Sequence, residues 1–509
     1  MVERLPNLIL SDAGPLRPTG RIGSERLLAG MWPRSVAMWM TGFWMVLFIL
    51  QPWDQLFPEL GEWHFERFYA LAVIILVLDC GLFRLTDSWQ TFGVLTFLFA
   101  VMLSWLFAVS PAEGWDDFYV YATMVVFYFI LISVVRTPYD LVFICLCYVG
   151  GMAVYLLKSE YEFFVHGHYV HTMGVKRLIG IETLYGGSNA LAASTVLTMP
   201  VAWFLWQTRR EFTKTWPVVF RQLLPFCLVV YACLAASAVV LTNSRSGMLG
   251  FVLFVLAVGH FSGKLSTKLY GAVGGILLIG VIWLIIPEEN RGRVRTIWAP
   301  ETGPASAWAS AYGRVEGLLA SLVMFERFPV TGVGVGNFIP YRVANVDGIE
   351  LQPHNLYGQV LAETGLVGTV AFLLLIGPTL ANCRKTRRLA RAKPDPVLRL
   401  LSPLAGACLI SLLLLLFFGL FGHNLLRFHW LWIAAFGLLC RMFAEAAARG
   451  NGSISAACLP LTRIAGADKP PPAPKRSLAA QASIGKSPSE PAAGGSPKGP
   501  ASPRKARSE

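Results

Sequence analysis

The sequence predicts an all-α, polytopic integral membrane protein with about twelve transmembrane helices and a large helical loop on the outer side. The first observation is composition: of 509 residues, 55% are hydrophobic and only 14% are charged, with a mean hydropathy of +0.55. A soluble domain of this length would carry more surface charge. Second, apolar runs of about 17 to 25 residues, long enough for a helix to cross a bilayer, recur along the chain. Third, basic and acidic loops alternate between these runs.

The apolar runs define the expected membrane helices. We expect these helices at residues 35–51, 67–83, 90–109, 118–135, 139–157, 187–207, 223–243, 246–262, 268–286, 365–382, 403–421 and 424–444. They divide the chain into an N-terminal tail (1–34), helices one to nine (35–286), an outer loop (287–364), helices ten to twelve (365–445) and a basic tail (446–509). The last segment is rich in Pro, Ala, Ser, Gly and Lys, which is typical of a disordered tail.

The charged residues of the loops predict the orientation. Segments 1–34, 208–222 and 383–402 are rich in arginine and lysine, whereas loops 52–66 and 110–117 carry an excess of acidic residues. Because cytoplasmic loops carry the positive charge, both termini are expected in the cytoplasm and the largest loop outside, in the periplasm if the cell has one. The net charge of +13 is explained in this way, and no nucleic-acid partner is expected.

The outer loop is expected to contain a helix of its own. Val315, Leu318, Leu322 and Phe325 recur at helical spacing, which predicts an amphipathic helix over 310–327 on the membrane surface.

Three arginines stand out on the predicted outer side: Arg177, Arg245 and Arg314. Arg245 lies in a tight turn between two apolar runs, flanked by Ser244 and Ser246. A lone arginine at a membrane boundary often extends to a lipid phosphate, and this interpretation stays open for each one taken singly. Three arginines that converge on one cavity would instead suit a phosphorylated ligand, because guanidinium groups contact phosphate oxygens in pairs.

Near the end of the outer loop, His354 and Asn355 open a helix that runs into the next apolar segment, and Glu363 comes shortly after them. The spacing of His354 and Glu363 is close to two and a half helical turns, so they are expected to share roughly one face. His354 is a candidate general base, because imidazole titrates near neutral pH; the alternative is a polar helix-start residue that faces water. Glu363 is a second catalytic candidate, or a buried hydrogen-bond partner.

Two further patterns suggest a metal or cofactor site without completing one. His166, His168 and His171 are closely spaced, but no carboxylate pattern accompanies them. The glycine-rich stretch 332–336 follows no predicted strand, so we expect a tight turn rather than a dinucleotide-binding loop. We therefore expect neither a metal nor a cofactor.

Taken in order, these motifs resemble the O-antigen ligase and polymerase superfamily of bacterial envelope glycosyltransferases, over roughly residues 90–440. The resemblance rests on the segment from Arg177 to Asn189, the SRSG turn at 244–247, Arg314 ahead of Pro329 and the Gly332–Gly336 turn, and His354-Asn355 followed by Glu363-x-Gly365. It implies a multi-pass protein of the bacterial inner membrane whose periplasmic loop caps the active site. It also implies a metal-independent enzyme that uses a polyprenyl-diphosphate-linked glycan as donor and a glycolipid or glycan as acceptor.

Residue chemistry and resemblance together give the expected roles. The expected site consists of the catalytic residues His354 and Glu363, the diphosphate-binding residues Arg177, Arg245 and Arg314, and the supporting residues Asn189, Ser244, Ser246 and Asn355.

Several activities remain open at this point. We favour a ligase, which moves a glycan onto lipid A-core or another surface acceptor, because the histidine-containing outer loop resembles that branch. A polymerase, which joins lipid-linked repeat units, is the alternative within the superfamily. A transporter for the same lipid-linked glycan is less favoured, because the charges cluster at the outer face and no inverted repeat is visible. A purely structural membrane scaffold is the remaining alternative.

Overall fold

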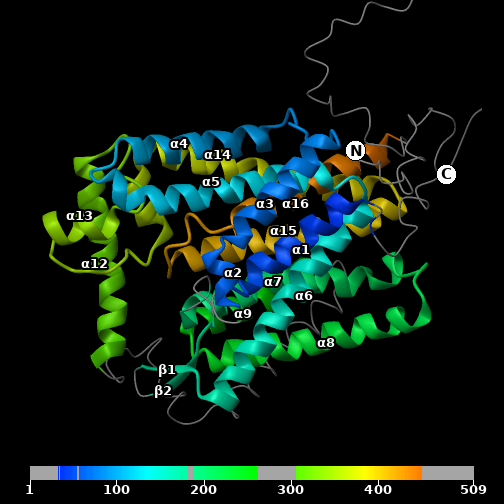
Figure 1. Ribbon diagram of the computed structural model, residues 1–509, viewed down its shortest axis with the longest axis horizontal. Coiled ribbons are helices and arrows are strands. Elements are labelled where there is room, and N and C mark those ends of the chain that lie inside the picture. Colours follow the sequence, from blue (N-terminus) through cyan, green and yellow to red (C-terminus); the bar gives the residue numbers. More distant parts are fainter. Residues whose placement is uncertain are drawn as a thin grey trace, which may run out of the picture. The chain divides into compact units, whose positions relative to one another are not determined.

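The computed structural model describes residues 33–449 except for 34, 54–56, 173–174, 182–184, 186 and 262–304. Helices make up most of the described chain, as Figure 1 shows, so the all-α class is confirmed. The expected ninth membrane helix and nearly all of both expected tails lie outside the described residues.

The described elements follow one another along the chain with mostly short connections. They are α1 (Val36–Leu50), α2 (Pro58–Glu62), α3 (Phe65–Asp79), α4 (Trp89–Leu106), α5 (Pro111–Val134), α6 (Pro138–Tyr161), the π-helical turn η2 (Glu162–His166), β1 (Tyr169–Thr172), β2 (Val175–Leu178), α7 (Ser188–Phe212), α8 (Val218–Leu241), α9 (Arg245–Phe261), α12 (Ala305–Arg327), α13 (Phe338–Asn345), α14 (Leu356–Ala392), α15 (Pro396–Gly419) and α16 (His429–Ala448).

Among the described residues, eight helices are long and apolar enough to cross a membrane: α4, α5, α6 with η2, α7, α8, α14, α15 and α16. Each expected membrane helix within the described residues coincides with a helix of the structure. However, α1 and α3 have 15 residues and α9 has 17, which is short for a full span. The structure therefore supports a polytopic membrane protein, and the expected number of twelve spans is not confirmed.

Several helix boundaries differ from the expected ones; α14, for example, runs over Leu356–Ala392 instead of 365–382. Helix α5 begins at Pro111 instead of residue 118, because proline is favoured at the first helical position. Its acidic residues, which we expected in a loop, therefore lie on the helix. Helix α16 begins at His429 instead of residue 424, because the polar segment before it forms a turn.

Helix α14 is a central element, since it packs against α4, α12, α15 and α16. It is kinked at Gly365, whose φ of 61° and ψ of −158° are not helical. At the kink the N–H of Leu366 donates to the carbonyl oxygen of Pro329 at 2.8 Å, and that of Val367 to Val330 at 3.2 Å. These bonds replace helical ones that the kink removes. A Cβ atom at residue 365 would lie 2.4 Å from the Val330 oxygen, so glycine is required.

The described part of the outer loop folds onto the start of α14. Helix α12 includes the expected helix over 310–327 and runs across the direction of α4 and α14 in Figure 1. A small hydrophobic cluster joins α12, α13 and the glycine-rich turn to α14: Ala320, Met324, Val333, Phe338, Tyr341 and Ala362. Two residues of the expected apolar face, Val315 and Leu322, are exposed on the opposite side of α12.

A β-hairpin that the sequence analysis did not predict precedes α7. Strands β1 and β2 pair antiparallel, with Val170 opposite Arg177. Val175 and Leu178 of β2 are buried, which anchors the hairpin and fixes the place of Arg177.

Candidate active site

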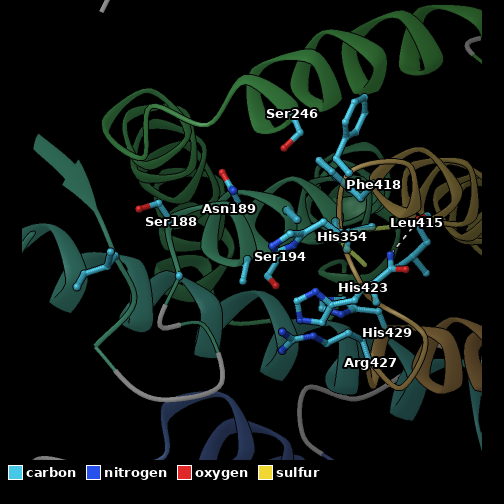
Figure 2. A pocket seen from close by; sticks show the side chains of 18 of the residues that line it. Ser188, Asn189, Ser194, Ser246, His354, Leu415, Phe418, His423, Arg427 and His429 are labelled. Atoms are coloured by element: carbon cyan, nitrogen blue, oxygen red, sulfur yellow. Dashed lines mark hydrogen bonds between the residues drawn. The ribbon is translucent and has the colours of Figure 1, made fainter. Parts of the chain in front are cut away.

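A cavity of about 400 Å³ lies where α7 and α14 begin. Its walls come from both strands, the first turns of α7 and α9, His354 ahead of α14, the end of α15, the α15–α16 loop and the start of α16. Figure 2 shows side chains of this wall, among them Asn189 of α7, Ser246 of α9, His354 ahead of α14 and Phe418 of α15. Segments that are far apart in the sequence therefore share one cavity.

The side chain of Arg177 is held at this wall by two neighbouring elements. Its Nε donates to the carbonyl oxygen of Thr242 at 2.9 Å, and its Nη2 donates to Oδ1 of Asn189 at 2.9 Å. The same Asn189 oxygen accepts a hydrogen bond from Oγ of Ser244 at 2.9 Å. Oγ of Ser244 in turn lies 3.2 Å from Oγ of Ser246. Three of the four expected supporting residues thus form one hydrogen-bonded chain that orients the guanidinium plane of Arg177.

Arg245 and Arg314 extend the positive charge around Arg177. Burial and then the charge of Arg245 lower the pKa of Arg177 to about 10. Burial and the charge of Arg245 also lower the pKa of Arg314. The three arginines therefore belong to one electrostatic cluster, with Arg245 within range of the other two. Arg177 alone of the three lines the described cavity.

His354 reaches the cavity from the segment just before α14. Its φ of 47° is in the left-handed region, which is uncommon for a residue other than glycine. Asn355 caps α14, because its Oδ1 accepts a hydrogen bond from the N–H of Gly358 at 3.0 Å. Burial, followed by the charges of Arg314 and Arg342, lowers the pKa of His354 below its usual value. The imidazole is therefore neutral at physiological pH and able to accept a proton.

The segment that precedes His354 is held in place by Arg342, a residue that was not predicted from the sequence. Arg342 lies on α13 and is fully buried. Its Nη2 donates to Oδ2 of Asp347 at 2.7 Å, and its Nη1 donates to the carbonyl oxygen of Leu351 at 3.1 Å. The hydrogen bond from Arg342 lowers the pKa of Asp347. These contacts hold the segment between α13 and His354 in one conformation.

The α15–α16 loop and the first residue of α16 add basic side chains that the sequence analysis also missed: His423, Arg427 and His429. Burial, then the charges of His354 and Arg427, lowers the pKa of His423 to about 4. Nδ1 of His423 and Nε2 of His429 are buried and have no hydrogen-bond partner among the described residues. The sequence could have pointed to these three residues, because ionisable residues inside an otherwise apolar stretch are a general indicator of function.

Glu363 lies away from the cavity, in the interior beside the glycine-rich turn. Its Oε2 accepts a hydrogen bond from Nε2 of Gln359 at 3.0 Å, and the backbone N–H groups of Gly336 and Phe338 donate to its carboxylate. Oε1 of Gln359 accepts from the N–H of Leu425 at 3.2 Å. Glu363 therefore connects the glycine-rich turn with the α15–α16 loop. This geometry favours the buried hydrogen-bond partner among the two roles considered for it.

Among the described residues that line the cavity, every titratable side chain is of a basic type. Five titratable side chains line it, and none is a carboxylate: Arg177, His354, His423, Arg427 and His429. Asp117 acts electrostatically on Arg427 without lining the cavity. Such a wall fits an anionic group and also offers a neutral imidazole. Within the described part of the chain, no group of His, Cys, Asp and Glu is arranged to hold a metal ion.

Comparison with known families adds an independent observation. Residues 228–373 match the family model described as O-antigen ligase. The matched range contains Arg245, Arg314, His354 and Glu363, whereas Arg177 precedes it. No curated protein matches the chain.

Proposed function

The chain belongs to the O-antigen ligase and polymerase superfamily, and on this premise we propose that it is a membrane glycosyltransferase of the ligase type. It transfers a glycan from a polyprenyl-diphosphate carrier to a hydroxyl of lipid A-core or another surface acceptor, on the outer face of the bacterial inner membrane. The observation that carries this proposal is the cavity that Arg177 and the neutral His354 share at one end of the membrane helices.

The arginines suit the leaving group of this reaction. Transfer from a lipid diphosphate releases a diphosphate anion, which needs positive charge at the bond that breaks. Arg177 offers a guanidinium group that Asn189 and Thr242 hold in a fixed orientation. Arg245 and Arg314 add charge within electrostatic range. We propose that the three arginines bind the diphosphate, with Arg177 in direct contact.

His354 is suited to activate the acceptor. A sugar hydroxyl is a weak nucleophile, and a positioned base that takes its proton accelerates the attack. In the proposed step the acceptor oxygen bonds to the anomeric carbon, and the bond between that carbon and the diphosphate oxygen breaks. The acceptor proton passes to the imidazole of His354. Direct displacement of this kind inverts the anomeric configuration.

Ligase and polymerase differ in what accumulates when the enzyme is lost. In a deletion strain, a ligase defect leaves the lipid-linked polymer intact while the surface acceptor stays bare. A polymerase defect instead yields single repeat units. The first outcome supports the proposal, and the second replaces it with the polymerase alternative.

A reaction with purified components tests the proposal directly. The full-length protein in nanodiscs is supplied with a polyprenyl-diphosphate-linked glycan and a glycolipid acceptor, in the presence of a chelator. Formation of glycosylated acceptor together with free polyprenyl diphosphate is the expected result. In proteoliposomes, movement of the intact donor across the bilayer without any glycosylated product would instead favour the transporter alternative.

A further inference from the structure

A second charged cavity lies at the other end of α7. Its volume is about 610 Å³, and it is formed by the last turns of α7, the α7–α8 turn and the first turns of α8. It is lined by Arg209, Arg210, Thr213, Lys214, Arg221, Gln222 and Pro225. Helix α7 has 25 residues, which corresponds to roughly 37 Å at the rise of an α-helix. Because α7 is a candidate membrane span, this cavity and the candidate active site lie at opposite membrane faces.

Positive charge at this cavity exceeds the negative charge that accompanies it. Four of the lining residues are cationic. Lys214 forms an ion pair with Glu211, with Nζ and Oε2 separated by 2.9 Å. Arg209, Arg210 and Arg221 add three further positive charges to the same cavity. Like charges that share a cavity repel one another. An anion bound between them is attracted to each of them and offsets this repulsion.

Arg209 gives the cavity a preformed wall. Its guanidinium carbon lies 3.8 Å from the centroid of the Trp206 ring, and its Nη1 donates to the carbonyl oxygen of Trp206. The side chain is therefore folded back onto α7 and half-buried, whereas Arg210 and Arg221 are exposed. Tryptophan is typical of the headgroup level of a membrane, so this wall is expected at the depth of lipid phosphates.

We infer that the cavity at the α7–α8 turn binds a phosphate group, carried by an anionic phospholipid headgroup or present as a free phosphate anion. Guanidinium groups recognise phosphate oxygens through paired hydrogen bonds, and basic pockets between membrane helices are suited to lipid headgroups. Basic residues are common in cytoplasmic loops of membrane proteins, and this preference accounts for the number of basic residues in this turn. It does not account for their convergence from two helices on one cavity, with one arginine stacked in place.

The test uses the purified full-length protein in detergent and measures its melting temperature as ligand is added. The probes are phosphatidylglycerol, the zwitterionic lipid phosphatidylcholine and inorganic phosphate. We expect phosphatidylglycerol to raise the melting temperature and phosphatidylcholine to have no effect. Stabilisation by inorganic phosphate at matched phosphate concentration would identify the free anion as the source. If phosphatidylglycerol stabilises the protein and inorganic phosphate does not, the lipid headgroup is the source.

A pair of double variants assigns the effect to this cavity. R210Q/R221Q removes two exposed charges from the cavity wall. The control, R384Q/R388Q, removes two exposed charges from the C-terminal part of α14. Helix α14 begins at the active-site cavity, so its C-terminal part lies at the same membrane face as the α7–α8 turn. We expect the first pair to weaken binding of the stabilising probe by roughly tenfold or more, because charge-assisted contacts are lost. The second pair should bind normally.

Two results would overturn the inference. In the first, neither phosphatidylglycerol nor inorganic phosphate raises the melting temperature. In the second, both double variants lose binding equally. If R210Q/R221Q inserts poorly, R210K/R221K serves in its place. Lysine keeps the charge that membrane orientation requires but loses the planar fork, so the phosphate affinity of a correctly inserted R210K/R221K should still fall.

Discussion

The imidazole rings of His354 and His423 lie 5.4 Å apart, centroid to centroid, with an angle of 50° between their planes. The two residues come from different segments, one just before α14 and the other in the α15–α16 loop. Burial lowers the pKa of both, and the charge of His354, once protonated, lowers that of His423 further. A proton on one ring therefore disfavours a proton on the other, so the pair holds at most one proton near neutral pH.

The first prediction concerns pH. The lowered pKa of His354 means that its neutral, proton-accepting form persists as the pH falls below 6.5. The transfer rate at saturating donor should therefore stay high below pH 6.5 and fall only at lower pH, where His354 becomes protonated. A pH–rate profile with donor binding measured in parallel tests this. An acid limb centred above pH 6.5 would contradict the neutral-imidazole assignment.

The second prediction separates chemistry from binding. His354→Ala should slow transfer by roughly 10²–10⁴-fold, because the base is lost, while donor affinity stays nearly unchanged. Both quantities are measured in one membrane mimetic, by single-turnover transfer and by binding of the lipid-linked donor. Lost donor binding with a normal rate at saturation would make His354 a phosphate ligand. His423, whose ring faces that of His354, would then be the next candidate for the base.

The third prediction concerns the planar group of Arg177. Arg177→Lys keeps the charge but cannot reproduce the hydrogen bonds to Asn189 and Thr242 together with a paired contact to phosphate. Donor binding should weaken by about 1.5–3 kcal/mol, the loss of one charge-assisted hydrogen bond. The control is Arg388→Lys at the other membrane face, which should bind donor normally. Equal affinities of Arg177→Lys and the unmodified protein would remove Arg177 from the donor site.

The sequence predicted much of the fold because long apolar runs constrain membrane helices to a narrow range of lengths. It also selected Arg177 and His354, because a charge beside an apolar run is expensive unless it is used. It missed His423 and Arg427, since their position in the cavity depends on how α15 and α16 pack against α7 and α14. Long-range packing of this kind leaves no periodic pattern in the sequence.

The expectation that His354 and Glu363 share one helical face does not hold, for a local reason. The argument placed both on one face of a regular helix, but His354 precedes α14 in a left-handed conformation. The carboxylate of Glu363 is then directed to Gln359 and to the glycine-rich turn. Helical spacing predicts shared faces only where both residues have helical backbone angles.

This placement of Glu363 gives a fourth prediction. Glu363→Ala should lower the free energy of unfolding by about 1–3 kcal/mol, because Gln359 and two backbone N–H groups lose a buried acceptor. Glu363→Gln keeps one acceptor oxygen and should lose less stability while retaining transfer activity. The readouts are the melting temperature and the saturated rate. A well-folded Glu363→Gln variant without transfer activity would restore a catalytic role for this residue.

The last prediction concerns which membrane face carries the site. Glu350, just before His354, and Arg388, near the end of α14, are both exposed and lie on opposite sides of the apolar part of that helix. Cys80, Cys227 and Cys233, which are exposed among the described residues, and Cys458 of the expected tail are first replaced by serine, so that they do not react. A membrane-impermeant thiol reagent applied to intact cells should then label Glu350→Cys and not Arg388→Cys, because the basic end of α14 is expected in the cytoplasm. Permeabilised cells provide the control, since both positions should then react. The reverse pattern in intact cells would place the arginines and His354 on the cytoplasmic side, where a surface acceptor is out of reach.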